Sequence, residues 1–348
     1  MTKEISPEPI IRTKLHRPLI ARDHVHRNNI SSRLNRNSHR PLVLISAPAG
    51  YGKSTVVSCW LKACDVPSAW VSLDKDDNDL RVFLSYFTAA VQRIFPVAFS
   101  KTLPMIKIEP LPPVSTLAKG LSNELDQVEK AFILVLDDYH LIRDKGIHDL
   151  VATLLQHPSK LMQLVLIGRH DPPLQLTSLR AKGQMLEIRT QDLRFSLEES
   201  AAFLQQMTGS SVEKSVAAFL EKKTEGWVTG LQLAALSMKH RKDLKRDLTD
   251  LPTENRYVMD YLVTEILFHY SSAVQTGMLK VSVLSRFCAP LCEAVYCSDS
   301  GSDGCDLNGR QFLKLLDNAN LFVIPLDDEH EWFRYHHLFQ ALLKRQLQ

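Results

Sequence analysis

The chain has 348 residues, enough for two or three domains with a large buried core, and its composition of 45% hydrophobic and 23% charged residues is ordinary for a globular protein. A formal net charge of +3 is too small to argue for nucleic acid or anionic lipid as a partner. No run of about 18 apolar residues predicts a membrane span, and the N-terminus lacks the apolar core of a signal peptide, so we expect a cytoplasmic protein without a membrane partner.

The first part of the chain is irregular. Residues 1–11 are expected to form a loose tail, because they carry prolines and few apolar side chains. Residues 13–34 are expected to form a loop followed by a short helix. The apolar run Leu42–Ser46 then predicts a buried strand.

A phosphate-binding loop follows this strand directly, with the sequence Ala47-Pro48-Ala49-Gly50-Tyr51-Gly52-Lys53-Ser54-Thr55. Such loops wrap backbone N–H groups around a phosphate chain and present it to the next helix. In this pattern Lys53 reaches the β- and γ-phosphates, and the hydroxyl of Ser54 ligates Mg²⁺. Gly50 and Gly52 supply backbone angles that a Cβ would obstruct. The pattern departs from its commonest form at Ala47, where glycine is usual.

Further apolar runs predict a parallel sheet. Strands are expected over 69–74, 132–138, 161–167 and 184–190, with a helix over 80–94 and a long Pro-rich loop over 104–113. Continuous apolar strands that alternate with helices are typical of a sheet covered on both faces. The first half of the chain is therefore expected to be an α/β domain.

Charged side chains end two of these strands. Asp137 and Asp138 close the most apolar run of the chain, and in P-loop proteins such acids hold the Mg²⁺ shell and orient the attacking water. Asp137 is the candidate on the metal side, and Asp138 is the candidate general base. Arg169 ends the next strand, where its guanidinium could sense or stabilise the γ-phosphate.

Helices dominate after about residue 195. Ser196 and Glu199 have the spacing of a capping box and should open a helix. Further helices are expected over 212–222, 228–239, 257–268 and 273–284, and the basic stretch 239–246 is expected to be a solvated linker or helix face. Two short strands, over 321–326 and 331–336, precede a helix that begins near His337. Helices followed by a β-hairpin suggest a winged helix.

Four of the six cysteines lie in this helical part: Cys288, Cys292, Cys297 and Cys305. Zinc sites favour paired Cys-x-x-Cys knuckles, which are absent here. Cys288 and Cys292 are one helical turn apart within an apolar stretch. The pattern predicts reduced, buried structural cysteines rather than a metal site or a disulfide frame.

A family resemblance rests on a succession of motifs that covers essentially the whole chain: Ala-Pro-Ala-Gly-Tyr-Gly-Lys-Ser-Thr, Val-Leu-Asp-Asp-Tyr-His, Asp-Leu-Arg-Phe-Ser, Glu-Gly-Trp-Val-Thr-Gly-Leu-Gln-Leu-Ala-Ala-Leu and Tyr-His-His-Leu-Phe. This succession resembles the large bacterial ATP-dependent LuxR-type activators. These are the MalT-like members of the STAND class, the signal-transduction ATPases with numerous domains.

The resemblance implies further nucleotide contacts, residue by residue. Val25-His-Arg27 is similar to a short N-terminal motif that contacts the nucleotide. The segment from Trp227 to Leu236 looks like a helix whose proline packs near the adenine in related ATPases, and this chain has Gln232 at that position. His336, rather than His337, corresponds to a winged-helix histidine that touches the β-phosphate of bound ADP.

The family also implies a domain order and a function. We expect a nucleotide-contacting N-terminal segment over 1–40, a P-loop domain over 41–195, a helical domain over 196–254 and a winged helix over 255–348. ADP would bind between the α/β domain and the winged helix and hold a closed monomer. An inducer and ATP would favour an open form that self-associates, with slow hydrolysis resetting the state.

Several alternatives remain open at this point. Family members carry an inducer-sensing region and a DNA-binding helix-turn-helix beyond their switch module, and neither is found here, so we expect the chain to be a fragment of a longer regulator. A stand-alone P-loop ATPase or a small-molecule kinase is another interpretation. Direct DNA binding by the winged helix is a weaker one, because only Lys344 and Arg345 of its last helix are obvious phosphate contacts.

Overall fold

The computed structural model describes residues 3–4, 10–21, 24–240, 270–296, 308–319, 321–327 and 329–347. The chain divides into two compact units. The first unit comprises Met1–Ala21, His26–Ala47 and Lys53–Asp192. The second comprises Arg22–Val25, Pro48–Gly52 and Leu193–Gln348, so the middle of the phosphate loop groups with the second unit although its flanks belong to the first.

The first unit is built on a parallel sheet of five strands in the order β3-β5-β6-β2-β7. Its strands are β2 (Leu42–Ser46), β3 (Ser68–Ser72), β5 (Phe132–Asp137), β6 (Met162–Gly168) and β7 (Met185–Arg189). Every residue of β2, β5 and β6 is buried, as expected for strands that are covered on both faces. The predicted α/β class is confirmed.

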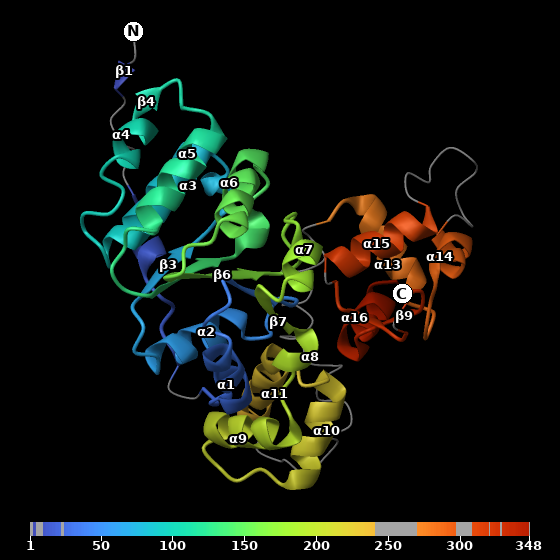
Figure 1. Ribbon diagram of the computed structural model, residues 1–348. Helices are drawn as coiled ribbons and strands as arrows, with labels where there is room; N and C mark the ends of the chain where they lie inside the picture. Colours follow the sequence, from blue (N-terminus) through green and yellow to red (C-terminus); the bar gives the residue numbers. More distant parts are fainter. Residues whose placement is uncertain are drawn as a thin grey trace. The chain divides into compact units, whose positions relative to one another are not determined.

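Helices pack on both faces of this sheet, with α3, α5 and α6 on one side and α1 and α2 on the other (Figure 1). The helices of this unit are α1 (Asn28–Arg36), α2 (Lys53–Lys62), α3 (Leu80–Gln92), α4 (Thr102–Ile106), α5 (Val114–Leu125), α6 (Lys145–Gln156), α7 (Leu176–Ala181) and α8 (Thr190–Leu193). Short 3₁₀ helices span Arg12–Leu15, Lys75–Asp77 and Tyr139–Leu141. Fully buried Phe83, Leu121 and Leu150 from α3, α5 and α6 pack with Leu134 and Leu164 of the sheet in one core.

Two segments that were predicted to be irregular are partly regular. Helix α4 begins at Thr102 and contains Pro104, which a first helical turn tolerates because its N–H groups have no intrahelical partner. The two-residue strand β4 (Ile108–Glu109) pairs antiparallel with β1 (Lys3–Glu4). The predicted long loop and loose tail were therefore wrong at these positions, because a short pairing between distant segments leaves no local signal in the sequence.

The second unit contains a three-helix part formed by α9 (Leu197–Thr208), α10 (Lys214–Thr224) and α11 (Val228–His240). The predicted capping box is present: Ser196 Oγ accepts a hydrogen bond from the Glu199 N–H, and Glu199 Oε2 accepts one from the Ser196 N–H. Leu204, Leu220 and Leu231 are fully buried in the core of this part.

The C-terminal part of this unit holds the predicted winged-helix elements. They are α13 (Ser272–Val281), α14 (Ala289–Tyr296), α15 (Gly309–Asn318), β8 (Val323–Pro325), β9 (Phe333–Tyr335) and α16 (His337–Leu347). Strands β8 and β9 form the expected antiparallel hairpin. The helix predicted over 257–268 and most of the basic stretch 239–246 lie outside the described residues.

The described cysteines agree with a structural role. Cys292 is fully buried in α14, and burial raises the pKa of its thiol to about 12. Cys288, Cys59 and Cys64 are free and partly buried, whereas Cys297 and Cys305 lie outside the described residues. Within the described part of the chain, no group of three or more His, Cys, Asp or Glu side chains could hold a metal ion.

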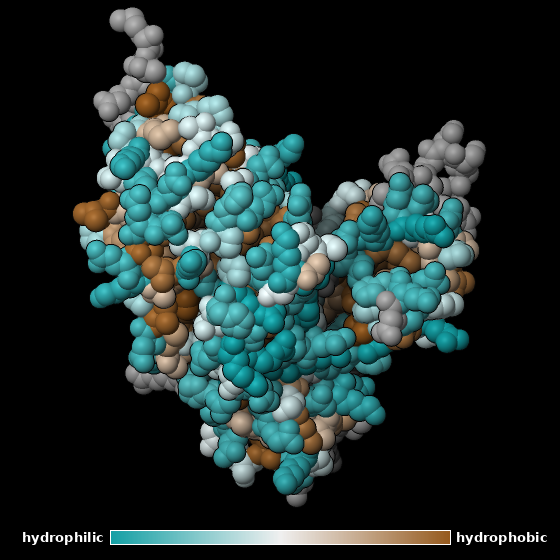
Figure 2. Space-filling model, in the orientation of Figure 1, coloured by the Kyte–Doolittle hydropathy of each residue, from teal (hydrophilic) through white to brown (hydrophobic). Residues whose placement is uncertain are grey.

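The visible surface of the first unit is mostly hydrophilic, and its hydrophobic side chains lie in small groups (Figure 2). Among the described residues, none of the helices has the length and apolar character needed to cross a membrane.

Candidate functional site

The phosphate loop leaves the carboxyl end of β2 and enters α2 at Lys53. Gly50 and Gly52 have φ angles of +76° and +72°, a conformation that residues with a Cβ rarely adopt. Lys53 and Ser54 form the first turn of α2, where backbone N–H groups lack intrahelical partners. The loop thus has the two glycines and the helix start that a phosphate cradle requires.

The start of α11 holds two carbonyl groups of this loop within the second unit. The indole Nε1–H of Trp227 donates to the carbonyl of Ala49 at 3.0 Å. The carbonyl of Gly50 accepts from both the N–H and the hydroxyl of Thr229, at 3.2 and 3.0 Å. A Cβ on Gly50 would lie 2.5 Å from Thr229 Oγ1, so glycine is also required for this close approach. The Trp227 motif was predicted from the sequence, whereas the role of Thr229 was not.

Tyr51, between the two glycines, is buried rather than exposed to a ligand. Its ring centroid lies 6.2 Å from that of Phe322, and burial raises the pKa of its phenol well above the ordinary value. Pro48 and Ala49 are also buried, whereas Thr55 is exposed on α2. Tyr51 therefore anchors the loop through packing.

The acid pair predicted at the end of β5 lies beside the start of α2 in the first unit. Ser54 Oγ donates to Asp137 Oδ1 at 3.0 Å, and the same oxygen accepts from the Asp138 N–H at 3.0 Å. Asp138 adopts φ +57°, which an aspartate tolerates better than most residues. Strand β6 lies between β2 and β5 in the sheet, so the contact of Ser54 with Asp137 is not a consequence of adjacent strands.

Burial shifts the pKa values of the charged groups at the carboxyl ends of these strands. Burial, and then the charge of Arg169, lowers the pKa of Lys53 to about 8, although Asp138 and Asp137 act in the opposite direction. Burial, followed by the charge of Asp138, raises the pKa of Asp137 to about 7. Burial also raises the pKa of Asp138. Such paired, perturbed groups at a sheet edge are typical of a functional site.

Arg169 follows β6 directly, as predicted, and is half-buried. Its charge lowers the pKa of both Lys53 and Asp138, so it belongs to the same electrostatic cluster. His140 joins this cluster and was missed, because its pattern is only that of a residue after a turn. Its Nδ1 lies 3.8 Å from Asp138 Oδ1, and burial, followed by the charge of Arg169, lowers its pKa to about 3. His140 is therefore a neutral ring beside the acid pair.

The residues of this cluster fit a magnesium–nucleoside phosphate. Mg²⁺ prefers oxygen ligands and is commonly held by one or two protein groups plus phosphate, which suits Ser54 and Asp137. The buried ammonium of Lys53, together with the N-terminus of α2, suits an anionic phosphate chain. Gly50 and Gly52 have no Cβ, so at these positions of the loop the backbone can approach a ligand closely.

Arg27 and Gln232 were also predicted to contact the nucleotide. Arg27 is buried at the start of α1, and its guanidinium donates to the carbonyl of Asp192 at 3.0 Å. Gln232 is exposed on α11.

His336 is fully enclosed in the second unit, with 1% of its surface exposed. Its Nε2 lies 2.8 Å from the carbonyl of Thr224, and its Nδ1 accepts from the Leu338 N–H at 3.3 Å. This pattern assigns the proton to Nε2. Burial lowers the pKa of His336 to about 4, so the ring is neutral near pH 7.

The neighbouring Glu225 binds the winged-helix hairpin through charge. It ends α10 at φ +50°, and its carboxylate accepts two hydrogen bonds from Arg334 of β9, at 2.8 and 2.9 Å. It also accepts from the His337 N–H at 3.2 Å, and a nitrogen of Arg194 lies 3.5 Å away. Burial raises the pKa of Glu225, but the hydrogen bonds from Arg334, the surrounding charges and the His337 N–H together outweigh burial and hold the pKa at about 2.

Residues 263–348 match the MalT winged helix domain. The chain is 33% identical to the HTH-type transcriptional regulator MalT of Klebsiella pneumoniae (strain 342) over 341 residues, and 33% identical to that of Yersinia pestis (strain Pestoides F) over 345 residues. Each alignment covers 97% of this chain but only 37% of the relative, so the chain spans little more than a third of those proteins.

The fold is also similar to that of a solved structure, a Walker-type ATPase from Pyrococcus abyssi. The TM-score is 0.65 at 14% sequence identity, and the superposition covers 94% of this chain and 98% of that one. At this identity the likeness concerns the fold alone: a parallel α/β sheet followed by helical and winged-helix parts.

Proposed function

We propose that this chain, which resembles MalT over 97% of its length, is the ATP- and ADP-binding switch module of a transcriptional regulator. The observation that carries the proposal is the cluster of Lys53, Ser54 and Asp137 beside a glycine-containing phosphate loop. The likeness to MalT over 97% of the chain favours regulation over metabolic catalysis.

The residues have separate proposed tasks at the nucleotide. Lys53 and the loop from Ala47 to Thr55 would bind the phosphates, and Ser54 with Asp137 would hold Mg²⁺. Bound Mg²⁺ and ATP supply a phosphoryl group that is open to attack by water. Asp138 would accept the proton of that water, because burial moves its pKa toward the range of a general base. Arg169 would stabilise the negative charge on the phosphoryl oxygens.

Arg27, Gln232 and His336 are proposed as further nucleotide contacts. For His336 the structure sets a condition, since backbone groups already use both ring nitrogens. A phosphate contact at Nε2 would have to replace its hydrogen bond to the carbonyl of Thr224. Loss of that bond would remove one of the hydrogen bonds that join the end of α10 to the start of α16.

The proposed switch has two forms. ADP would favour a closed monomer, and ATP with an inducer would favour an open form that self-associates. Such a switch requires that the two nucleotides bind the two forms with different affinities. Slow ATP hydrolysis would then reset the state rather than drive turnover.

The nucleotide that co-purifies with the chain tests this proposal. The protein is denatured and its supernatant is analysed by ion exchange, and bound ADP is the expected result. Lys53→Ala should abolish retention, whereas Lys62→Ala, an exposed lysine at the other end of α2, should not. Absence of nucleotide from the wild-type protein, with no binding of added ADP or ATP, would refute the proposal.

The size of the protein in ADP and in ATP tests the regulatory half separately. Light scattering should detect larger species with Mg²⁺ and a non-hydrolysable ATP analogue, once the inducer is supplied to the longer regulator. The inducer, a DNA-binding helix-turn-helix and a cytoplasmic location are proposed for that longer protein. Rapid ATP consumption that depends on a small acceptor would instead indicate a kinase.

A further inference from the structure

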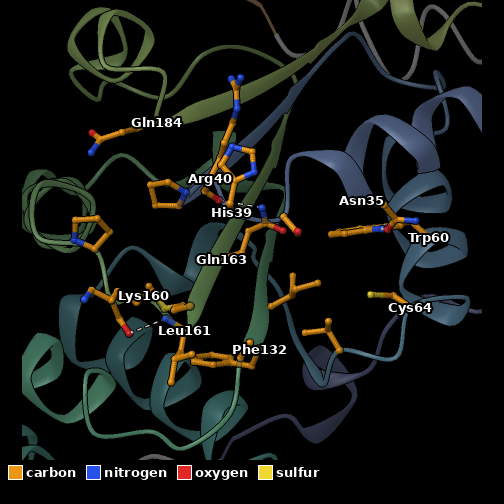
Figure 3. Close-up of a pocket in the computed structure, with 18 of the residues that line it drawn as sticks. Asn35, His39, Arg40, Trp60, Cys64, Phe132, Lys160, Leu161, Gln163 and Gln184 are labelled. Atoms are coloured by element: carbon orange, nitrogen blue, oxygen red, sulfur yellow. Dashed lines mark hydrogen bonds between the residues drawn. The ribbon is translucent and has the colours of Figure 1, made fainter.

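A pocket of about 570 Å³ opens at the amino-terminal edge of the sheet in the first unit (Figure 3). Pro41, Phe132, Met162 and Gln184 line it at the starts of four parallel strands. The phosphate loop follows the opposite end of β2, so this pocket is separate from the nucleotide-binding edge. Its volume lies within the range of small-molecule sites, about 300–1,000 Å³.

The wall of the pocket is largely apolar, with an aromatic side chain on each of two sides. Figure 3 shows Trp60 and Cys64 across the pocket from Lys160 and Leu161, with Phe132 below Gln163. The indole N–H of Trp60 is already used, because it donates to Asn35 Oδ1 at 2.7 Å. The ring of Trp60 therefore offers an occupant only an apolar surface.

Two buried polar atoms of the lining residues have no hydrogen-bond partner among the described residues. Gln163 is 5% exposed and donates both amide hydrogens, to the carbonyls of Asn37 and Arg40, which leaves its Oε1 as an unused acceptor. Arg40 donates through Nη1 to the carbonyl of Met185, while its Nε–H is an unused donor. An unpaired buried polar group costs roughly 1–3 kcal/mol, so an occupant that pairs with these atoms would be stabilised.

The charge of the pocket is one-sided. Arg40 and Lys160 line it, and none of the described lining residues is an aspartate or a glutamate. A carboxylate could therefore approach Arg40 or Lys160 without meeting an opposing acid. The apolar walls require that the rest of the occupant be apolar and preferably flat.

We propose that this pocket binds a small aromatic carboxylate that also carries an N–H or O–H donor. The carboxylate pairs with Arg40 or Lys160, the donor satisfies Gln163 Oε1 directly or through one water, and the ring lies among Trp60, Phe132 and Leu161. The site does not depend on the proposed nucleotide switch, because none of these residues belongs to the phosphate-loop cluster.

Alkylation of Cys64 provides a site-specific test. Iodoacetamide is reacted with the intact chain with and without indole-3-acetate, and the alkylated peptides are quantified by mass spectrometry. Saturating probe should slow the labelling of Cys64 about fivefold or more, because an occupant shields a lining thiol. Cys59, a partly buried cysteine of α2 that does not line the pocket, should be unaffected.

Matched probes and variants test the recognition groups. Indole-3-acetamide lacks the charge and 1-methylindole-3-acetate lacks the donor, so each should bind about tenfold more weakly. Lys160→Glu should weaken binding in calorimetry, whereas Lys119→Glu, the same charge change at an exposed site of α5, should not. Cys64→Trp, which fills the pocket, should abolish binding.

Three results would overturn the proposal. One is that no member of a panel of aromatic carboxylates protects Cys64 at millimolar concentration. Another is that the neutral amide binds as tightly as the acid. The third is that ATP displaces the probe from the wild-type protein but not from Lys53→Ala, since the probe would then occupy the phosphate loop rather than this pocket.

Discussion

The substitution Arg334→Met should destabilise the second unit, because it removes the guanidinium that pairs with Glu225. The side chain of Glu225 is 8% exposed, so water would replace the two lost hydrogen bonds poorly. Methionine keeps much of the length of arginine and limits the loss of packing. A buried carboxylate without its partner is the main expected cost.

The pKa of Glu225 sets the size of this effect. A fall from the ordinary 4.5 to about 2 corresponds to roughly 3 kcal/mol, of which Arg334 supplies only part, because other nearby charges and the His337 N–H also lower the pKa. The side chain of Arg334 is 26% exposed, so solvent screening lowers the expected cost of the substitution to about 2 kcal/mol. Because the pKa is lower in the folded state, this stabilisation is complete above about pH 5 and is lost as the pH falls from 4.5 toward 2.

Urea unfolding of the wild type, Arg334→Met, Glu225→Gln and the double variant measures the coupling. Hydrogen exchange of amides in α10 and β9 locates the loss in the second unit. The double variant should be less destabilised than the sum of the singles by about 1–2 kcal/mol at pH 7. The reasoning fails if this coupling is below about 0.5 kcal/mol, or if Arg334→Met leaves the pH dependence between 5 and 3 unchanged.

Three further substitutions have expected outcomes. Trp227→Phe removes the hydrogen bond to the carbonyl of Ala49, so it should cost about 1–3 kcal/mol in thermal unfolding and weaken ADP binding in calorimetry. Unchanged values for both would contradict the anchoring role of Trp227. The fold raises the pKa of Asp137 to about 7, so the stability of the nucleotide-free wild type should fall as the pH rises from about 4 to 7. Asp137→Asn removes this charge and should therefore stabilise the nucleotide-free protein at pH 8. The variant should also lose the increase in melting temperature that Mg²⁺ and ATP give. Burial lowers the pKa of His336 to about 4, so the wild type should lose about 3 kcal/mol of stability as the pH falls from 6.5 to 4. His336→Gln should remove this loss. Equal pH profiles for variant and wild type would show that His336 does not cause the loss.

Local patterns predicted most of the elements. The strand at Leu42–Ser46 was placed at its observed bounds, and the capping box at Ser196 opens α9 as expected. Both signals are local, since an apolar run marks a fully covered strand and a Ser-x-x-Glu spacing satisfies the first N–H groups of one helix. The pairing of β1 with β4 joins segments about 100 residues apart. It was missed because such a distant pairing leaves no local pattern in the sequence.

In the candidate site, too, some residues could be predicted from local sequence patterns and others could not. Lys53 and Ser54 form a contiguous motif with a known spacing, and the acid pair follows an apolar strand, so their chemistry could be predicted from the sequence alone. Thr229, which binds the carbonyl of Gly50, had no such signal, because a threonine at the start of a helix is ordinary. Its role depends on which loop the fold brings next to α11.

The sequence by itself determined the class of the chain: a parallel α/β domain with a phosphate loop and a helical, winged-helix part. Only the tertiary structure decided how the charged groups are paired. Glu225 meets Arg334 across 109 residues, and His336 meets the carbonyl of Thr224 across 112. Motifs are predictable because neighbouring residues share one backbone geometry, whereas a buried charge selects its partner only when packing has excluded water from both.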